Sequence, residues 1–158
     1  TLAGGNVIAV DIFDEKLEMA KKVGAVEVLN AKEEEDVAKK IRRLTGVGAD
    51  IAIEVIGNPT TIEQAFNSVR WGGKVIVVGY THKDVSLNAG KIMFREIEIK
   101  GSLGCGLQDF PKVIDLVKHG KMDVKEFVTH RFKLDEINEG FALLEGGDPS
   151  LIRAIAIP

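Results

Sequence analysis

The chain has 158 residues, of which 45% are hydrophobic and 28% are charged, a balance typical of a globular protein with one core. Its net charge of −3 offers no positive field to a phosphate backbone, so nucleic acid is not expected as a partner. No apolar run reaches the roughly 18 residues of a membrane span, and a cytoplasmic protein is expected. The single cysteine, Cys105, cannot form an intrachain disulfide or a thiolate zinc cage by itself.

Four short runs of mostly apolar, β-branched residues lie in the first half of the chain, at residues 6–12, 27–29, 50–56 and 74–78. Such runs are typical of strands buried on both faces, as in a parallel sheet. Three amphipathic helices are predicted between them, with apolar stripes Leu17, Ala20 and Val23, then Val37, Ile41 and Leu44, then Ile62, Ala65, Phe66 and Val69. This alternation predicts an α/β doubly wound sheet.

The third helix carries its own start and stop signals. Thr60 and Glu63 have the spacing of a capping box, and Gly72 with Gly73 is expected to end the helix. Beyond this point the pattern predicts a helix over 89–95 and an edge strand over 97–103, because apolar and polar residues alternate there. Two helices follow, with stripes Phe110, Val113, Ile114 and Val117, then Leu134, Ile137, Phe141 and Leu144, beside short strands near 127–132 and 153–157.

Ligands of doubly wound sheets bind beyond the carboxyl ends of the strands, so the residues after each strand are candidate binding residues. Asp11 is the next-to-last residue of the first run, where a carboxylate can accept hydrogen bonds from the ribose diol of NAD and would repel the 2′-phosphate of NADP. Lys16 lies about one helical turn later and can reach the same ribose. The alternatives are that Asp11 only caps the helix and that Lys16 only faces solvent.

The third and fourth runs are each followed by a glycine between two neighbours, Ile56, Gly57 and Asn58 after the third and Val78, Gly79 and Tyr80 after the fourth. Ile56 can lie against an adenosine, and a glycine lets the backbone approach a ligand closely. The carbonyl and amide groups after the fourth run can bind a carboxamide. Both glycines are equally consistent with plain turns.

The glycine-rich phosphate cradle GxGxxG is absent from the chain. The acidic ribose residue normally follows that motif by about 20 residues, and this interval counted back from Asp11 ends before residue 1. The chain also opens on Thr1 rather than Met. We therefore expect the first strand and the glycine-rich turn to belong to a longer parent protein.

No residue of this chain is predicted to be catalytic or to bind a metal. His82, His119 and His130 are scattered without the spacing of a metal site, and each is expected to be a loop or surface residue. Cys105 lies between two glycines, with no adjacent basic residue to lower the pKa of its thiol, and is expected to be structural.

Four segments resemble, in the same order, parts of the zinc-containing medium-chain alcohol dehydrogenases: VIAVDIFDEKLEMAKKVGA, GADIAIEVIGNPTTIEQAF, GGKVIVVG and THRFKLDEINEGFALLEGG. The similarity spans essentially the whole chain. Its most specific part is EINEGFALL followed by a basic residue in the last strand. The chain thus resembles the C-terminal part of this family, which comprises most of a Rossmann-like coenzyme domain and a C-terminal tail.

The resemblance implies contacts to the adenosine of NAD. It places Asp11 and Lys16 at the ribose, with Ile12 and Ile56 on the two sides of the adenine. Asn58 stands where some relatives have a basic residue beside the adenine, which weakens that contact.

The resemblance also implies contacts to the rest of the cofactor. The nicotinamide carboxamide would be held by two backbone segments, Val78, Gly79 and Tyr80 and then Ser102, Leu103 and Gly104. Arg153 matches a position that reaches the pyrophosphate, where a guanidinium can pair with phosphate oxygens.

The resemblance implies that the chain has two parts. Residues 1–103 correspond to a partial NAD-binding Rossmann domain, and residues 104–158 correspond to a segment that returns to the catalytic domain in this family. Zinc is expected only in the full-length parent, where it polarises an alcohol oxygen while a hydride passes to NAD. The fragment is therefore expected to be inactive alone. The strand over 97–103 is expected to join two copies into a homo-oligomer.

Two other functions stay open. The chain is alternatively a nucleotide-binding or self-associating module without catalysis, or part of a zinc-free quinone or enoyl reductase of the same superfamily. The substrate is expected to be a small alcohol or carbonyl compound, and its identity does not follow from the fold.

Overall fold

The computed structural model describes all residues, 1–158. The elements in chain order are β1 (Ile8–Asp11), α1 (Asp14–Lys22), β2 (Glu27–Asn30), α2 (Val37–Thr45), β3 (Ala49–Glu54), α3 (Pro59–Ser68), β4 (Val69–Val77), α4 (Ala89–Arg95), β5 (Glu98–Gly101), α5 (Asp109–Lys118), η1 (Lys125–Phe127), β6 (Val128–Lys133), η2 (Leu134–Glu136), α6 (Ile137–Glu145) and β7 (Arg153–Ile157). They form two compact units, which are described separately. Unit 1 comprises Thr1–Asn30 and Cys105–Pro158, and unit 2 comprises Ala31–Gly104.

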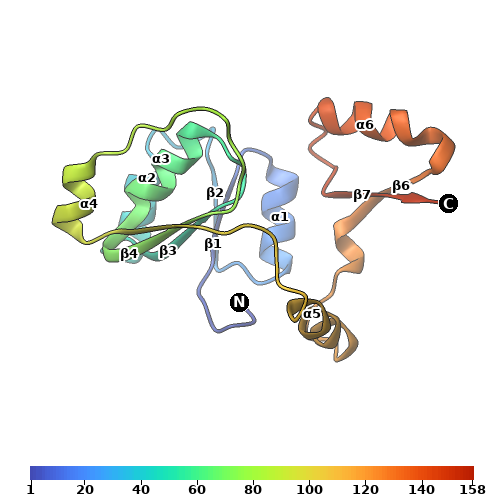
Figure 1. Cartoon of the computed structure of the whole chain (residues 1–158), viewed down its shortest axis with the longest axis horizontal. Helices are drawn as coiled ribbons and strands as arrows, with labels where there is room; N and C mark the ends of the chain where they lie inside the picture. The colour runs from blue at the N-terminus through green and yellow to red at the C-terminus, as the bar shows by residue number, and fades with distance from the viewer. The chain divides into compact units, whose positions relative to one another are not determined.

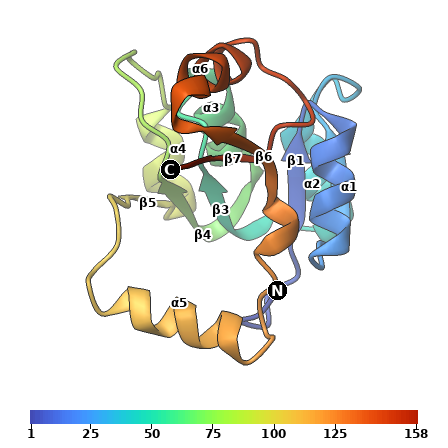
Figure 2. The ribbon, with the colours of Figure 1, turned by 90° about the vertical axis from the view of Figure 1, so that its right-hand side faces the viewer.

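Unit 2 contains a three-stranded parallel sheet in the order β3-β4-β5, with α2, α3 and α4 beside it (Figure 1; β5 is labelled in Figure 2). Its core is formed by Phe66 of α3, Val69 and Val75 of β4, and Ile97 just before β5. Lys74 of β4 forms an ion pair with its register partner Glu98 of β5 at 3.0 Å. Because β5 pairs with β4 alone, it is an edge strand, as its alternating sequence predicts.

The two faces of this sheet differ. In the second half of β3, Ala52 and Glu54 are the less exposed residues, while Ile51 and Ile53, which alternate with them, are 54% and 64% exposed. Alternate residues of a strand point to opposite faces, so only one face of β3 is covered within the unit. The prediction that this run is buried on both faces is wrong for unit 2, because Ile51 and Ile53 on one of its faces are exposed.

Unit 1 contains two separate pairs of parallel strands. β1 pairs with β2, and α1 packs against both of them. β6 pairs with β7, and α6 lies beside that pair (Figure 2). The contact of α6 with β6 is close, since a Cβ built on Gly140 would lie 3.0 Å from the ring of Phe132.

The α/β class with parallel strands connected through helices is confirmed, whereas the start and the end of the third helix were predicted wrongly. α3 begins one residue after Asn58, whose side-chain oxygen accepts a hydrogen bond from the Thr60 amide at 2.9 Å. Asn58 is therefore the N-cap in place of Thr60, and Pro59 occupies the first helical position that suits it. The helix ends at Ser68 rather than at Gly72, because Val69 already pairs with Ala49 of β3. None of the helices combines the length and the apolar character that a membrane-spanning helix needs.

Candidate functional site

Asp11 is the last residue of β1, and its half-buried side chain is held by the backbone that follows it. Its Oδ1 atom accepts hydrogen bonds from the amides of Ile12 at 2.7 Å and Phe13 at 3.1 Å. These two bonds fix the orientation of the carboxylate, while Oδ2 accepts no hydrogen bond within the chain. A carboxylate in this state can accept further hydrogen bonds from a ligand with two adjacent hydroxyl groups.

Two neighbours of Asp11 in unit 1, Ile12 and Lys16, have different surroundings. Ile12 is exposed directly after the strand, where it can contact an apolar ring. The Nζ atom of Lys16 lies 5.0 Å from the centroid of the Phe13 ring, in the range of a cation–π contact. The ammonium group thus has a partner in the chain, and its contact with a ribose stays a prediction.

In unit 2 the turns that follow β3 and β4 meet at two glycines. Gly57 has a φ of 78°, and a Cβ built on it would lie 2.0 Å from the carbonyl oxygen of Tyr80. A Cβ built on Gly79 would lie 2.1 Å from the backbone nitrogen of Gly57. No side chain fits at either position, so the two turns touch backbone to backbone. The structure therefore brings together the two predicted segments 56–58 and 78–80.

The sequence predicts no role for Glu54, the last residue of β3, although this residue contacts both turns. Its side chain is only 4% exposed, and its Oε1 atom accepts hydrogen bonds from the amides of Ile56 at 2.8 Å and Gly57 at 2.9 Å. Its carbonyl oxygen accepts from the amides of Val78 at 2.8 Å and Gly79 at 3.1 Å. A signal was present in the sequence, because a carboxylate ends an otherwise apolar run.

The third predicted segment follows β5. The Ser102 amide donates a hydrogen bond to the carbonyl oxygen of Val77 at 2.9 Å, which ties the end of β5 to the end of β4. Leu103 is fully exposed, and Gly104 has a φ of 59°, in the left-handed region that favours glycine. The carboxyl ends of β3, β4 and β5 thus present backbone groups from all three predicted segments of unit 2.

Arg153, the first residue of β7 in unit 1, is exposed. Its backbone carbonyl lies 3.5 Å from the hydroxyl of Thr129, and its guanidinium forms no ion pair with an acidic side chain of the chain. A guanidinium without an internal partner can bind an external phosphate.

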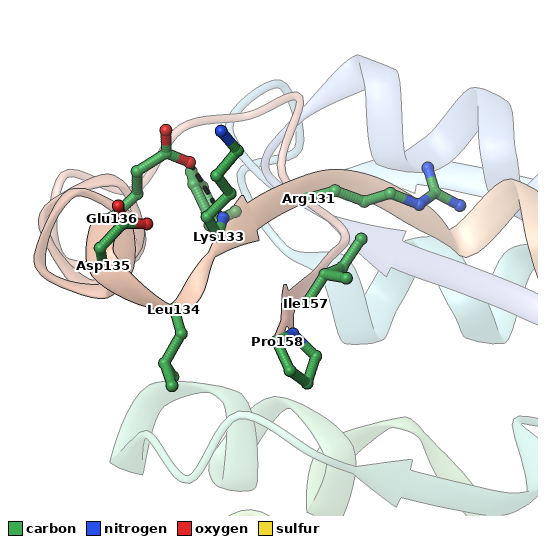
Figure 3. Close-up of a pocket in the computed structure, with 8 residues that line it drawn as sticks. Arg131, Lys133, Leu134, Asp135, Glu136, Ile157 and Pro158 are labelled. Carbon is green, nitrogen blue, oxygen red and sulfur yellow. Dashed lines mark hydrogen bonds between the residues drawn. The ribbon is translucent and has the colours of Figure 1, made fainter.

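An open pocket of about 910 Å³ lies at the carboxyl ends of β6 and β7 (Figure 3). Its lining is formed by residues 131–136 with Ile157 and Pro158. Glu136 is turned toward the backbone of Lys133, whose amide donates to its Oε2 atom at 2.9 Å. None of the predicted binding residues lines this pocket, and Arg153 is at the opposite end of β7.

The side chains that bind metals in proteins are not grouped in this chain. No cluster of three or more His, Cys, Asp or Glu side chains is arranged to hold an ion. The Nδ1 atom of His119 lies 2.8 Å from the carbonyl oxygen of Asp115 on its own helix, and Cys105 is an exposed free thiol.

One lysine of unit 2 has a perturbed acid–base equilibrium. The pKa of Lys91 is lowered from its ordinary value, first by burial and then by the positive charges of Arg95 and Arg42. Both Lys91 and Arg42 hydrogen-bond to Asn67, through its side-chain and its backbone oxygen respectively. Because Asn67 is in the last turn of α3, this group of cations lies at a helix C-terminus, where positive charge is stabilising.

The chain is similar to proteins of one known family. The family of zinc-binding dehydrogenases matches residues 1–119. The L-threonine 3-dehydrogenase of Chromobacterium violaceum is 32% identical over 143 residues, which cover 90% of this chain and 42% of that protein. The sorbitol dehydrogenase of Bacillus subtilis is 34% identical over 137 residues, covering 85% of this chain and 38% of the relative.

Solved structures agree with the sequence comparison. The 2R,3R-butanediol dehydrogenase from Bacillus subtilis superposes with a TM-score of 0.88 at 30% identity, covering 99% of this chain and 45% of that chain. The benzyl alcohol dehydrogenase from Acinetobacter calcoaceticus gives a TM-score of 0.87 at 28% identity. The chain therefore spans less than half the length of the proteins it matches.

Parallel strands with glycine turns at their carboxyl ends define the class as a Rossmann-like α/β protein. Within that class, the chain belongs to the zinc-binding dehydrogenase family, among the medium-chain dehydrogenases, and corresponds to the C-terminal part of its members. The resemblance seen in the four sequence segments is thereby confirmed.

Proposed function

We propose that this chain is the cofactor-binding part of an NAD-dependent alcohol dehydrogenase, which transfers a hydride between an alcohol or carbonyl substrate and NAD. The observation that carries the proposal is the Asp11 carboxylate, which two amides orient at the carboxyl end of a parallel strand. The names of the relatives, which are dehydrogenases of L-threonine, sorbitol and butanediol, support an alcohol as substrate.

The proposed roles of the two parts of the chain are those that the family resemblance implies. Residues 1–103 form a partial NAD-binding domain, and residues 104–158 return to the catalytic domain of a longer protein. Asp11 and Lys16 bind the adenosine ribose, and Arg153 pairs with the pyrophosphate. Ile12 and Ile56 contact the adenine, and Asn58 gives a weaker contact beside it. Gly57 lets the backbone approach the cofactor closely, and the carboxamide binds to the backbone of residues 78–80 and 102–104.

The residues of this chain suit the binding of NAD, which is one part of the proposed reaction. Unpaired carboxylate and guanidinium atoms at Asp11 and Arg153 suit the diol and phosphates of a dinucleotide. When NAD is bound, its nicotinamide accepts or gives the hydride. The side chains of this chain do not form a zinc site, so no zinc-dependent step is derived from them. The fragment alone is proposed to bind NAD weakly and to be inactive.

Replacing Asp11 by glycine in the full-length protein that carries this chain tests the cofactor assignment. We expect the KM for NAD to rise about tenfold, because charge-assisted hydrogen bonds to the diol are lost, while NADP is affected little or favoured. Asp84→Gly, in an exposed loop of unit 2, is the matched control. An unchanged ratio of kcat/KM for NAD and NADP would refute the ribose role of Asp11.

We also propose that the chain forms a homo-oligomer through the edge strand 97–103. The supporting observation is that β5 pairs only with β4, so the backbone groups of its other long side have no strand partner. A cytoplasmic location stays a prediction, as do the alternatives of a non-catalytic module and a zinc-free reductase.

A further inference from the structure

The position of Glu54 follows from the alternation of β3. Together with Ala52 it points to the helix-covered face of the sheet, and it comes last, where the strand passes into the turn before α3. This places a carboxylate among buried groups at the N-terminal end of a helix, where negative charge is stabilised. With 4% of its surface exposed, Glu54 is one of only two polar residues in the buried set.

The carboxylate holds the turn that follows it through one oxygen. Oε1 accepts the amides of Ile56 and Gly57, and the Thr61 hydroxyl lies 2.8 Å from the same atom. That hydroxyl is also 2.9 Å from the carbonyl oxygen of Asn58, so its single proton serves one acceptor at a time. The conformation of 56–57, including the positive φ of Gly57, is thus fixed by a buried side chain.

The other oxygen of this carboxylate, Oε2, is buried and has no hydrogen-bond partner in the chain. An unpaired buried acceptor is destabilising, whereas an apolar residue would fill the same space without that cost. A glutamate at this position therefore does more than fill the space, and what it provides is the acceptor Oε1 aimed at two amides.

The same residue reaches the second turn by a different route. Its carbonyl oxygen binds the amides of Val78 and Gly79, and the contact between Gly57 and Tyr80 leaves no room for the turns to shift independently. A change in the backbone of 56–57 must therefore be transmitted to 78–80.

We propose that Glu54 is a positioning residue for the cofactor, whose side chain sets the backbone of both 56–57 and 78–80. This inference rests on the proposed function, which assigns those two segments to the adenosine and the nicotinamide carboxamide of NAD. Glu54 itself need not touch the cofactor.

Three variants separate this role from mere structural support. Glu54→Met keeps the length of the side chain and removes the acceptor, whereas Glu54→Gln keeps one carbonyl oxygen for the two amides. Glu63→Met makes the same replacement at an exposed position of α3 and is the matched control. Thermal unfolding first establishes a temperature at which all variants are folded.

The first measurement uses the chain without cofactor. In 15N-labelled protein, Glu54→Met should increase the hydrogen-exchange rates of the Ile56 and Gly57 amides about tenfold and shift the resonances of residues 78–80 as well. Glu54→Gln should restore most of both effects. Resonances of 78–80 that stay unchanged in Glu54→Met would overturn the coupling of the two turns.

The second measurement uses the full-length protein. Glu54→Met should raise the KM for NAD about tenfold with the KM for the alcohol unchanged, and Glu54→Gln should stay within about threefold of the unaltered protein. Equal losses in the two variants, or none in either, would refute the positioning role. If the unaltered protein shows no NAD-dependent activity, the proposed function fails, and the amide measurement still decides whether Glu54 sets both turns.

Discussion

Replacing Gly57 by alanine should destabilise unit 2 strongly, for two reasons that can be measured separately. The φ of 78° places the residue in the left-handed region, which costs an L-residue about 1–2 kcal/mol. The new Cβ would also lie 2.0 Å from the Tyr80 carbonyl oxygen, so the two turns must move apart by more than 1 Å to reach the 3.4–4 Å of ordinary contact. Forcing an atom into a packed site costs about 1–3 kcal/mol more.

Gly46 provides the control for the first reason. It has a φ of 81° in the same unit, but a Cβ built on it meets no atom within 4 Å. Gly46→Ala should therefore lower the free energy of unfolding by about 1–2 kcal/mol, and Gly57→Ala by roughly 2–5 kcal/mol. Urea unfolding followed by the fluorescence of Trp71, the only tryptophan and a residue of β4, reports on this unit. A loss in Gly57→Ala no larger than that in Gly46→Ala would contradict the close approach of the turns.

Two further predictions concern charge and assembly in unit 2. The pKa of Lys91 is lowered from 10.5 by burial and by neighbouring cations, so Lys91 binds a proton more tightly in the unfolded chain than in the folded one. The free energy of unfolding should therefore rise with pH between the lowered pKa and 10.5. Urea unfolding across that range should show the rise to be smaller in Lys91→Met, and equal slopes would count against it. Ile99→Glu would set like charges on paired β5 strands and should weaken self-association about tenfold in analytical ultracentrifugation, while Val113→Glu on α5 should not. A dimer that is unaffected by Ile99→Glu would place the interface elsewhere.

The sequence predicted most elements because their signals are local. The helix α4 has the predicted bounds, and the strand predicted over residues 6–12 is present over the shorter range Ile8–Asp11. The errors arose where a distant partner decides the outcome. Val69 leaves the helix because it pairs with Ala49, a contact between residues far apart in the chain that periodicity does not contain.

The candidate site was predictable to a similar degree. A glycine after a strand is visible in the sequence, but the reason for Gly57, a carbonyl oxygen of Tyr80 where a Cβ would be, depends on the fold. Glu54 was missed because its spacing matches no motif, and its importance comes from burial and from the amides it accepts. Ile51 and Ile53 of β3 are exposed although their apolar run predicts burial, because an apolar run does not reveal which element covers it.

The meeting of Gly57 and Gly79 has a consequence for how substitutions combine. Each Cβ would enter the backbone of the opposite turn, so one substitution already forces the separation that the other would require. Alanine at both positions should cost less than the sum of the single replacements, and a larger residue in one turn cannot be offset by a smaller one in the other. The costs of substitutions at Gly57 and Gly79 are therefore not additive, because both depend on the same distance between the two turns.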